Sequence, residues 1–415
     1  MHPSDDSDAR RQKGLSLKNQ GDELTRLGGA ENLAKAVQLC DEAIVLLGDQ
    51  PVAADGSDRD ELASAWMKRG IALLNMGAPE ALAEAIRCFD QAIELRKKLP
   101  LAENAAFRYG LAACWLNRGD ALARIGGEEN LDPALASHAE AIALLETLPL
   151  ETDPLYVKRL AIAWLNRGIA LEFKKTAPAL AEAIQSYHKT IALLENPKYA
   201  GDGSLDFILA GAWLNAGNAT LQASGETAAP ETCAAAEKAL SLVAKTESRE
   251  PESAEIGFKA RNVLCRATIA LLMATENADA RMDLIGKITD TVEDGLRLAQ
   301  QWEKGRVAHF RPIATQLFHV GALVYEKEQP QFLSEFLIDH LDPDRATCVM
   351  PLVVHLDNDW YTIATQALAR VRQRVHSLDF ALLATPQGQH WIDIMNGVTE
   401  AESRLQELRE GVVSV

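Results

Sequence analysis

The hexapeptide AWLNRG, residues Ala163–Gly168, has three close copies elsewhere in the chain. CWLNRG ends at Gly119, AWMKRG ends at Gly70 and AWLNAG ends at Gly217. The tryptophans of these four stretches follow one another at intervals of 49 residues: Trp66, Trp115, Trp164 and Trp213. A fixed period of this length predicts an array of similar units, each of which packs mainly on its neighbours.

Each unit has the pattern of two helices. Trp66, Gly70 and Leu73 are spaced so that they share one face of a first helix. Gly77 and Pro79 then predict a break. The next stretch predicts a second helix with a single apolar face, formed by Ala85, Phe89 and Ala92, and the unit ends at Pro100.

Two further columns recur with the tryptophans. The glycine column is Gly70, Gly119, Gly168 and Gly217, and the arginine column is Arg69, Arg118 and Arg167. Glycine lets two helices approach closely, and we expect the tryptophan to fill the space beside it. The arginine stems are expected to lie over tryptophans, with their guanidinium groups on carboxylates such as Glu84 and Glu182. Anion binding is the alternative role for the arginines.

The units resemble tetratricopeptide repeats over roughly residues 10–247. That family's pattern is an aromatic residue, a glycine four positions later, a large residue three after it, an alanine–aromatic–alanine signature and a closing proline. The resemblance implies a right-handed, all-α solenoid of helical hairpins. The period of 49 residues departs from the family's period of about 34. We assign three of the extra residues to the turn inside each hairpin and twelve to the interval between units, where they lengthen the first helix at its start.

This pattern divides the chain into three segments. Residues 1–13 are predicted to be a flexible leader, and residues 14–247 are predicted to form five repeats. The pattern decays after this point. Residues 248–415 are therefore predicted to hold degenerate repeats and a less regular helical region that caps the array or docks a partner.

Composition narrows the classes of function. The formal net charge of −17 argues against a nucleic-acid-binding surface. The N-terminus lacks the apolar run of a signal peptide, and the uncharged stretch Phe207–Gly225 contains too many amides to be a membrane span. None of the six cysteines forms a C-x-x-C pair, as expected of free thiols in a reducing cytoplasm. The oligomeric state stays open.

Polar columns lie opposite the packed face of the first helices. In a stacked solenoid they would line the inner, concave wall, where the resemblance implies that peptides bind. Asparagine offers both a hydrogen-bond donor and an acceptor, which suits the backbone of an extended peptide. The alternative is that these asparagines bond to one another or to water between neighbouring helices. The residues predicted to contact a partner are Asn19, Lys68, Asn117, Asn166, Asn215, Asp120, Asn218, Arg124 and Phe173.

Signatures of enzymes are missing from the sequence. It contains no nucleotide-binding glycine loop, no H-E-x-x-H motif and no G-x-S-x-G motif, so we expect no catalytic residue, metal site or cofactor. The sequence therefore predicts a non-enzymatic, cytoplasmic scaffold or adaptor that binds a protein or peptide, alone or as a subunit of a larger complex. Two alternatives are a peptide-sensing regulator that changes shape on binding and an enzyme with its site in the C-terminal region.

Overall fold

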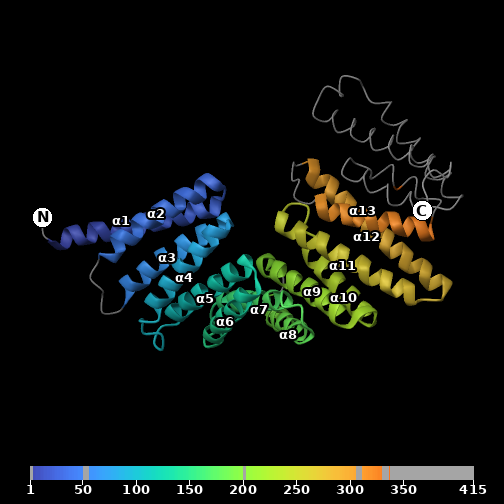
Figure 1. Cartoon of the computed structure of the whole chain (residues 1–415), viewed down its shortest axis with the longest axis horizontal. Helices are drawn as coiled ribbons and strands as arrows, with labels where there is room; N and C mark the ends of the chain where they lie inside the picture. The colour runs from blue at the N-terminus through green and yellow to red at the C-terminus, as the bar shows by residue number, and fades with distance from the viewer. Residues whose placement is uncertain (1–2, 50–55, 200–201, 305–310, 330–335, 337–415) are drawn as a thin grey trace, which may run out of the picture. The chain divides into compact units, whose positions relative to one another are not determined.

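The computed structural model describes residues 3–49, 56–199, 202–304, 311–329 and 336, and every regular element within these ranges is a helix (Figure 1). The predicted all-α class is therefore confirmed. The chain divides into two compact units, which we call unit 1 (Met1–Ala219) and unit 2 (Thr220–Val415).

Unit 1 is built from helical hairpins, and each of its first eight helices contacts the next one of the eight along the chain. Its helices are α1 (Pro3–Leu27), α2 (Ala30–Gly48), α3 (Ser57–Met76), α4 (Pro79–Arg96), α5 (Ala105–Ile125), α6 (Glu128–Glu146), α7 (Pro154–Glu172) and α8 (Ala177–Leu194), followed by the start of α9 (Gly203–Ser224). The first helices of successive hairpins also contact one another, α1 with α3, α3 with α5 and α5 with α7. We call the face formed by these four helices the first-helix wall.

Unit 2 holds the end of α9 and four further α-helices of the described residues. These are α10 (Ala229–Val243), α11 (Pro251–Ala274), α12 (Ala278–Lys304) and α13 (Arg311–Glu328). α11 contacts α10, α12 and α13, so it lies at the centre of this group. A buried ion pair joins Arg261 of α11 to Glu247, and the backbone oxygen of Glu247 also accepts a hydrogen bond of 2.9 Å from Trp302 Nε1. Residues 337–415, which hold most of the predicted capping region, lie outside the described residues.

Local sequence fixes where these helices begin. The side chains of Asn104 and Asp153 accept hydrogen bonds from the backbone N–H groups two residues later, and Thr176 does so from Ala179. Such caps satisfy N–H groups that have no partner inside the helix. The turn from α5 to α6 is Gly126–Gly127, where both residues have positive φ (73° and 82°). Residues with a Cβ rarely adopt this conformation, so glycine is required there.

Several predicted boundaries differ from the structure. Only Gly77 and Ala78 separate α3 from α4, so the prediction of a lengthened turn is wrong, and the extra residues extend the helices instead. α1 begins at Pro3, so residues 3–13 are helical and do not form the expected flexible leader. The two compact units divide after Ala219, within α9, and not at residue 247.

A glycine in each first helix lies against one side chain of the second helix. A Cβ atom at Gly70 would lie 2.6 Å from Phe89 Cε1, one at Gly119 would lie 2.6 Å from His138 Cε1, and one at Gly168 would lie 2.4 Å from Tyr187 Cε1. Gly21 has the same relation to Cys40, whose Sγ would lie 2.9 Å away. In each case the partner follows its glycine by 19 residues. The second helix, and not the tryptophan, therefore fills the space beside the glycine, which corrects the expectation from the sequence.

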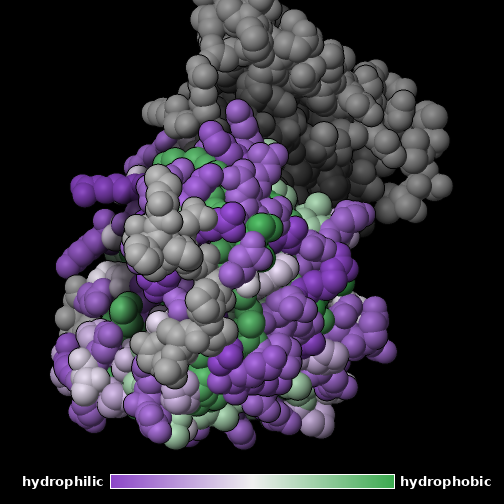
Figure 2. Space-filling view, turned by 90° about the vertical axis from the view of Figure 1, so that its left-hand side faces the viewer, coloured by the Kyte–Doolittle hydropathy of each residue, from purple (hydrophilic) through white to green (hydrophobic). Residues whose placement is uncertain are grey.

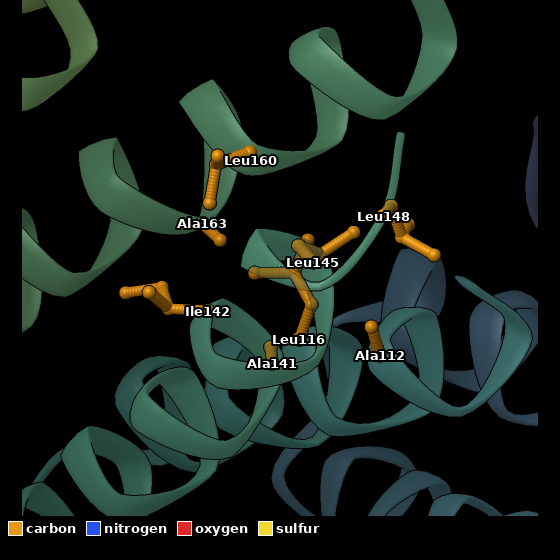
Figure 3. Packing of buried hydrophobic residues seen from close by; sticks show 8 residues of the cluster. All are labelled: Ala112, Leu116, Ala141, Ile142, Leu145, Leu148, Leu160 and Ala163. Atoms are coloured by element: carbon orange, nitrogen blue, oxygen red, sulfur yellow. The ribbon is translucent and has the colours of Figure 1, made fainter. Parts of the chain in front are cut away.

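The tryptophans lie at the joints between hairpins. Trp66 packs beside Ala63, Ile93 and Leu111, which come from three different helices. Trp115 and Trp164 flank the next cluster, in which Leu116 of α5, Leu145 of α6 and Leu160 of α7 converge (Figure 3). Each tryptophan is half-buried and seals one hairpin against the next.

The arginine column lies at the edge of these joints. The guanidinium groups of Arg118 and Arg167 lie 5.7 and 5.8 Å from the ring centroids of Trp115 and Trp164. Each also reaches a carboxylate: Arg69 contacts Asp41 and Glu84, Arg118 contacts Asp90, and Arg167 contacts Glu182, all at 2.6–2.9 Å. These contacts join neighbouring helices.

Replacement of Gly168 by alanine should destabilise unit 1. The new methyl group would overlap Tyr187, and overpacking of this kind costs about 1–3 kcal/mol of unfolding free energy. Chemical denaturation of the full chain measures the loss. Gly48→Ala is the matched control, because no atom lies within 4 Å of a Cβ at Gly48 in α2. Equal stability of the two variants would contradict the close approach.

Candidate functional site

Polar contacts connect neighbouring helices along the first-helix wall. Lys68 Nζ of α3 lies 2.6 Å from Asp22 Oδ1 of α1. Asn166 Nδ2 of α7 donates a hydrogen bond of 2.7 Å to Asp120 Oδ1 of α5. Three of the residues predicted to contact a partner, Lys68, Asn166 and Asp120, are thus partly engaged within the protein, as the alternative interpretation of the polar columns expects.

A cavity of about 660 Å³ opens in this wall where α5, α6 and α7 meet. Four of the nine residues predicted to contact a partner line it, namely Asp120, Arg124, Asn166 and Phe173. The remaining lining residues are Ala123, Gly126, Gly127, Glu128, Leu131, His138, Ile169 and Lys175. Phe173, the residue directly after α7, is 55% exposed, so its ring is accessible at the cavity.

The imidazole of His138 borders this cavity from α6. Its side chain is fully buried, and neither ring nitrogen has a hydrogen-bond partner among the described residues. Nε2 lies 3.8 Å from Asp120 Oδ1, which is too long for a hydrogen bond. A buried polar atom without a partner costs about 1–3 kcal/mol, so a ligand group that reaches this nitrogen would gain from the contact.

Burial shifts the pKa values of both residues. Loss of solvation raises the pKa of Asp120 to about 6, against the opposing effects of the Asn166 hydrogen bond and of Arg124 and Arg159. Loss of solvation, together with the positive charge of Arg167, lowers the pKa of His138 to about 4. At neutral pH this part of the cavity therefore presents a neutral imidazole beside an ionised carboxylate.

The other predicted contact residues do not line this cavity. Asn19 is exposed on α1, and Lys68 is held by Asp22. Asn117 and Asn215 are half-buried and make no hydrogen bond within the described ranges. Asn218 lies on α9, also half-buried. Of the nine predicted contact residues, the structure thus brings four together where α5, α6 and α7 meet.

Reasoning from the sequence missed His138 and Lys175. For His138 a signal was available, because it follows Gly119 by 19 residues, as Phe89 follows Gly70. Lys175 lies in the turn after α7 with a φ of 54°, which is uncommon for a residue with a side chain. No pattern in the sequence identifies that turn.

The described ranges contain neither a membrane-spanning helix nor a cluster of metal ligands. No helix there combines the length and the hydrophobicity needed to cross a membrane. No group of three or more His, Cys, Asp or Glu side chains in these ranges could hold a metal ion. Figure 2 shows a face on which hydrophilic residues dominate and apolar residues form separate small patches.

Comparisons with known proteins leave the family unassigned. No protein-family model matches the chain, and no curated protein matches it. Among solved structures, the chain is similar to the apo form of RapI, with 11% identity, a TM-score of 0.45 and coverage of 76% of this chain and 99% of that one. It is also similar to a circular tandem repeat protein with novel repeat topology, with 15% identity, a TM-score of 0.30 and coverage of 98% and 99%.

Replacement of His138 by phenylalanine should make the protein less sensitive to acid. The pKa of a histidine is about 6.5 in an unfolded chain, whereas that of His138 is lowered to about 4 in the folded state. As the pH falls below 6.5, His138 becomes protonated in the unfolded chain but stays neutral in the folded protein. The free energy of unfolding of the wild type therefore falls. Between pH 8.0 and 5.5 the wild type should lose roughly 1 kcal/mol more unfolding free energy than His138→Phe.

Denaturation at the two pH values measures this difference. Asp120 acts in the opposite direction, because its raised pKa favours the folded state as the pH falls toward 6. Both chains should therefore also be compared in an Asp120→Asn background. The same acid sensitivity with and without His138 would contradict a buried neutral imidazole.

Proposed function

We propose that the chain is a non-enzymatic scaffold whose first-helix wall binds an extended segment of a protein partner. The observation that carries this proposal is the convergence of Asp120, Arg124, Asn166 and Phe173 on one open cavity in that wall. These residues come from two first helices, so a segment that contacts all of them crosses the joint between hairpins.

The chemistry of the wall suits a peptide. Asn117 is half-buried without a partner in the described ranges, and Asn166 uses only its amide N–H group on Asp120, which leaves its oxygen as an acceptor. Phe173 and Ile169 supply apolar area for one anchoring side chain. Polar groups for the backbone and an apolar recess for a side chain together support recognition of an extended chain.

The lining of the cavity supports binding over covalent catalysis. Shifted pKa values gather at enzyme active sites as well as at binding sites. However, no serine, threonine or cysteine is among the residues that line this cavity. Asp120 and His138 thus have no hydroxyl or thiol nucleophile to activate there.

Replacement of Phe173 by alanine should weaken peptide binding without a loss of stability. Selection of random twelve-residue peptides on the full chain supplies ligands, and calorimetry measures their affinity. Loss of an exposed aromatic anchor should reduce affinity about tenfold. Glu140→Ala, an exposed residue on α6, serves as the control.

Two results would contradict the proposal. One is that no peptide binds the full chain in the selection. The other is that the selected peptides bind the Phe173→Ala and Asn117→Ala variants as tightly as the wild type.

A further inference from the structure

The Gly-Gly turn beside the cavity in unit 1 has a counterpart 98 residues earlier in the chain. The turn Gly126–Gly127 corresponds to Gly28–Gly29, where φ is likewise positive (68° and 82°). Asn32 and Asn130 cap these turns in the same way, with hydrogen bonds of 2.8 and 2.7 Å to Gly28 O and Gly126 O. The two hairpins α1–α2 and α5–α6 thus share the same local geometry around their turns.

The corresponding aspartates have different partners. Asp22 is met by two cations, Lys68 Nζ at 2.6 Å and Arg26 Nη2 at 3.0 Å. At the later site Asn166 stands in the place of Lys68, 98 residues on. Asp120 receives a neutral amide hydrogen bond from Asn166, and no lysine or arginine of the described residues lies within ion-pair distance of it.

The different partners shift the pKa values of the two aspartates in opposite directions. Burial alone would raise the pKa of Asp22, but hydrogen bonds and charges from Lys68 and Arg26 lower it below the ordinary value. At Asp120 burial prevails and the pKa is raised. Asp120 is therefore a partly buried carboxylate that lacks the cation its counterpart has.

A second, independent feature points to a ligand at the same place. His138 replaces Cys40 of the earlier hairpin, and its fully buried ring has two nitrogens without partners among the described residues. In the neutral ring one of these nitrogens is an acceptor. Because both ring nitrogens are buried, the Asn166 oxygen is the acceptor that the cavity offers beside Asp120.

We propose that this cavity binds the ammonium group of a lysine side chain of the partner, which would occupy at Asp120 the place that Lys68 occupies at Asp22. This inference rests on the proposed function and names the side chain that anchors the peptide. The ammonium group would donate hydrogen bonds to the Asp120 carboxylate and to the Asn166 oxygen. The lysine stem would lie beside Ile169 and the exposed ring of Phe173.

The charged residues around Asp120 are compatible with a cation. Arg124 is exposed and donates a hydrogen bond of 3.3 Å to Leu74 O, and its charge and that of Arg159 oppose the rise that burial causes in the pKa of Asp120. Arg159 lies over the ring of Tyr109, at 5.4 Å from the ring centroid. Lys175 and Glu128 are exposed at the rim with opposite charges. Because solvent screens exposed charges strongly, the partly buried Asp120 should dominate the binding of a ligand that reaches it.

Three small probes test the assignment on the full-length chain. The first is lysine blocked at both backbone ends, with a free ε-ammonium group. The second is the same compound acetylated on the ε-nitrogen, which keeps the length and removes the charge. The third is norleucine amide, whose free α-ammonium group represents a peptide amino terminus. Ring signals of 13C-labelled histidine report binding, with His138 assigned by its loss in His138→Phe.

Two variants distinguish a loss of the binding site from a loss of folding. Asn166→Lys should recreate the Asp22–Lys68 pair within the chain and so occupy the site, whereas Asp120→Asn removes the charge and preserves the shape. Asp22→Asn is the matched control at the earlier hairpin. Thermal unfolding shows whether each variant remains folded, and Asn166→Lys keeps the test decisive if Asp120→Asn does not fold.

We expect the free lysine probe to shift the His138 signal with saturation at millimolar concentrations. Its affinity should fall at least tenfold in Asp120→Asn, disappear in Asn166→Lys and persist in Asp22→Asn. The proposal is overturned if the acetylated probe binds equally well, if norleucine amide binds more tightly, if Asn166→Lys still binds, or if the lysine probe does not bind. If the affinity of the selected peptides still depends on Phe173 in that event, only the assignment of a lysine side chain fails. If the selection yields no binding peptide, the proposed function itself fails.

Discussion

The close approach of two helices at a glycine underlies each hairpin of unit 1. Gly21, Gly70, Gly119 and Gly168 leave space for one side chain of the second helix, which lies against bare backbone. The glycine lowers helix propensity by about 1 kcal/mol relative to alanine, and the packing against it must offset that cost. Since the tryptophans seal the joints between hairpins instead, the glycine contact holds each hairpin together and the tryptophan holds the array together.

The same contact links the fold to the candidate site. The residue opposite the glycine changes along the chain, from Cys40 to Phe89, His138 and Tyr187. At Phe89 the position is purely apolar, whereas His138 is a buried imidazole beside a cavity, and neither of its ring nitrogens has a hydrogen-bond partner among the described residues. One position in the repeat can therefore alter the binding surface while the glycine contact is preserved.

Much of this arrangement was predictable because period and spacing determine which residues share a face. The 49-residue period predicts the helical pairs. It also predicts that Asp120 lies near Asn166, because the two residues are separated by one repeat minus three residues. The lengths of the turns could not be predicted from the period, because additional residues can extend a helix as readily as a loop. In α3 and α4 the additional residues extend the helices. His138 stands at the place of Phe89 in the repeat, 19 residues after its glycine, but the predicted polar columns did not include that place. The turn at Lys175, with its φ of 54°, has no local signature in the sequence.

The candidate site depends most on the protonation states of His138 and Asp120. A titration of the full chain by NMR, with 13C labels on the histidine rings and the aspartate carboxyl groups, measures both pKa values directly. For a buried neutral imidazole beside a carboxylate that has no lysine or arginine partner among the described residues, we expect a pKa of about 4 for His138 and of about 6 for Asp120. If both groups titrate at their ordinary values, near 6.5 and 3.8, they are solvated and the proposed site does not exist in the form described.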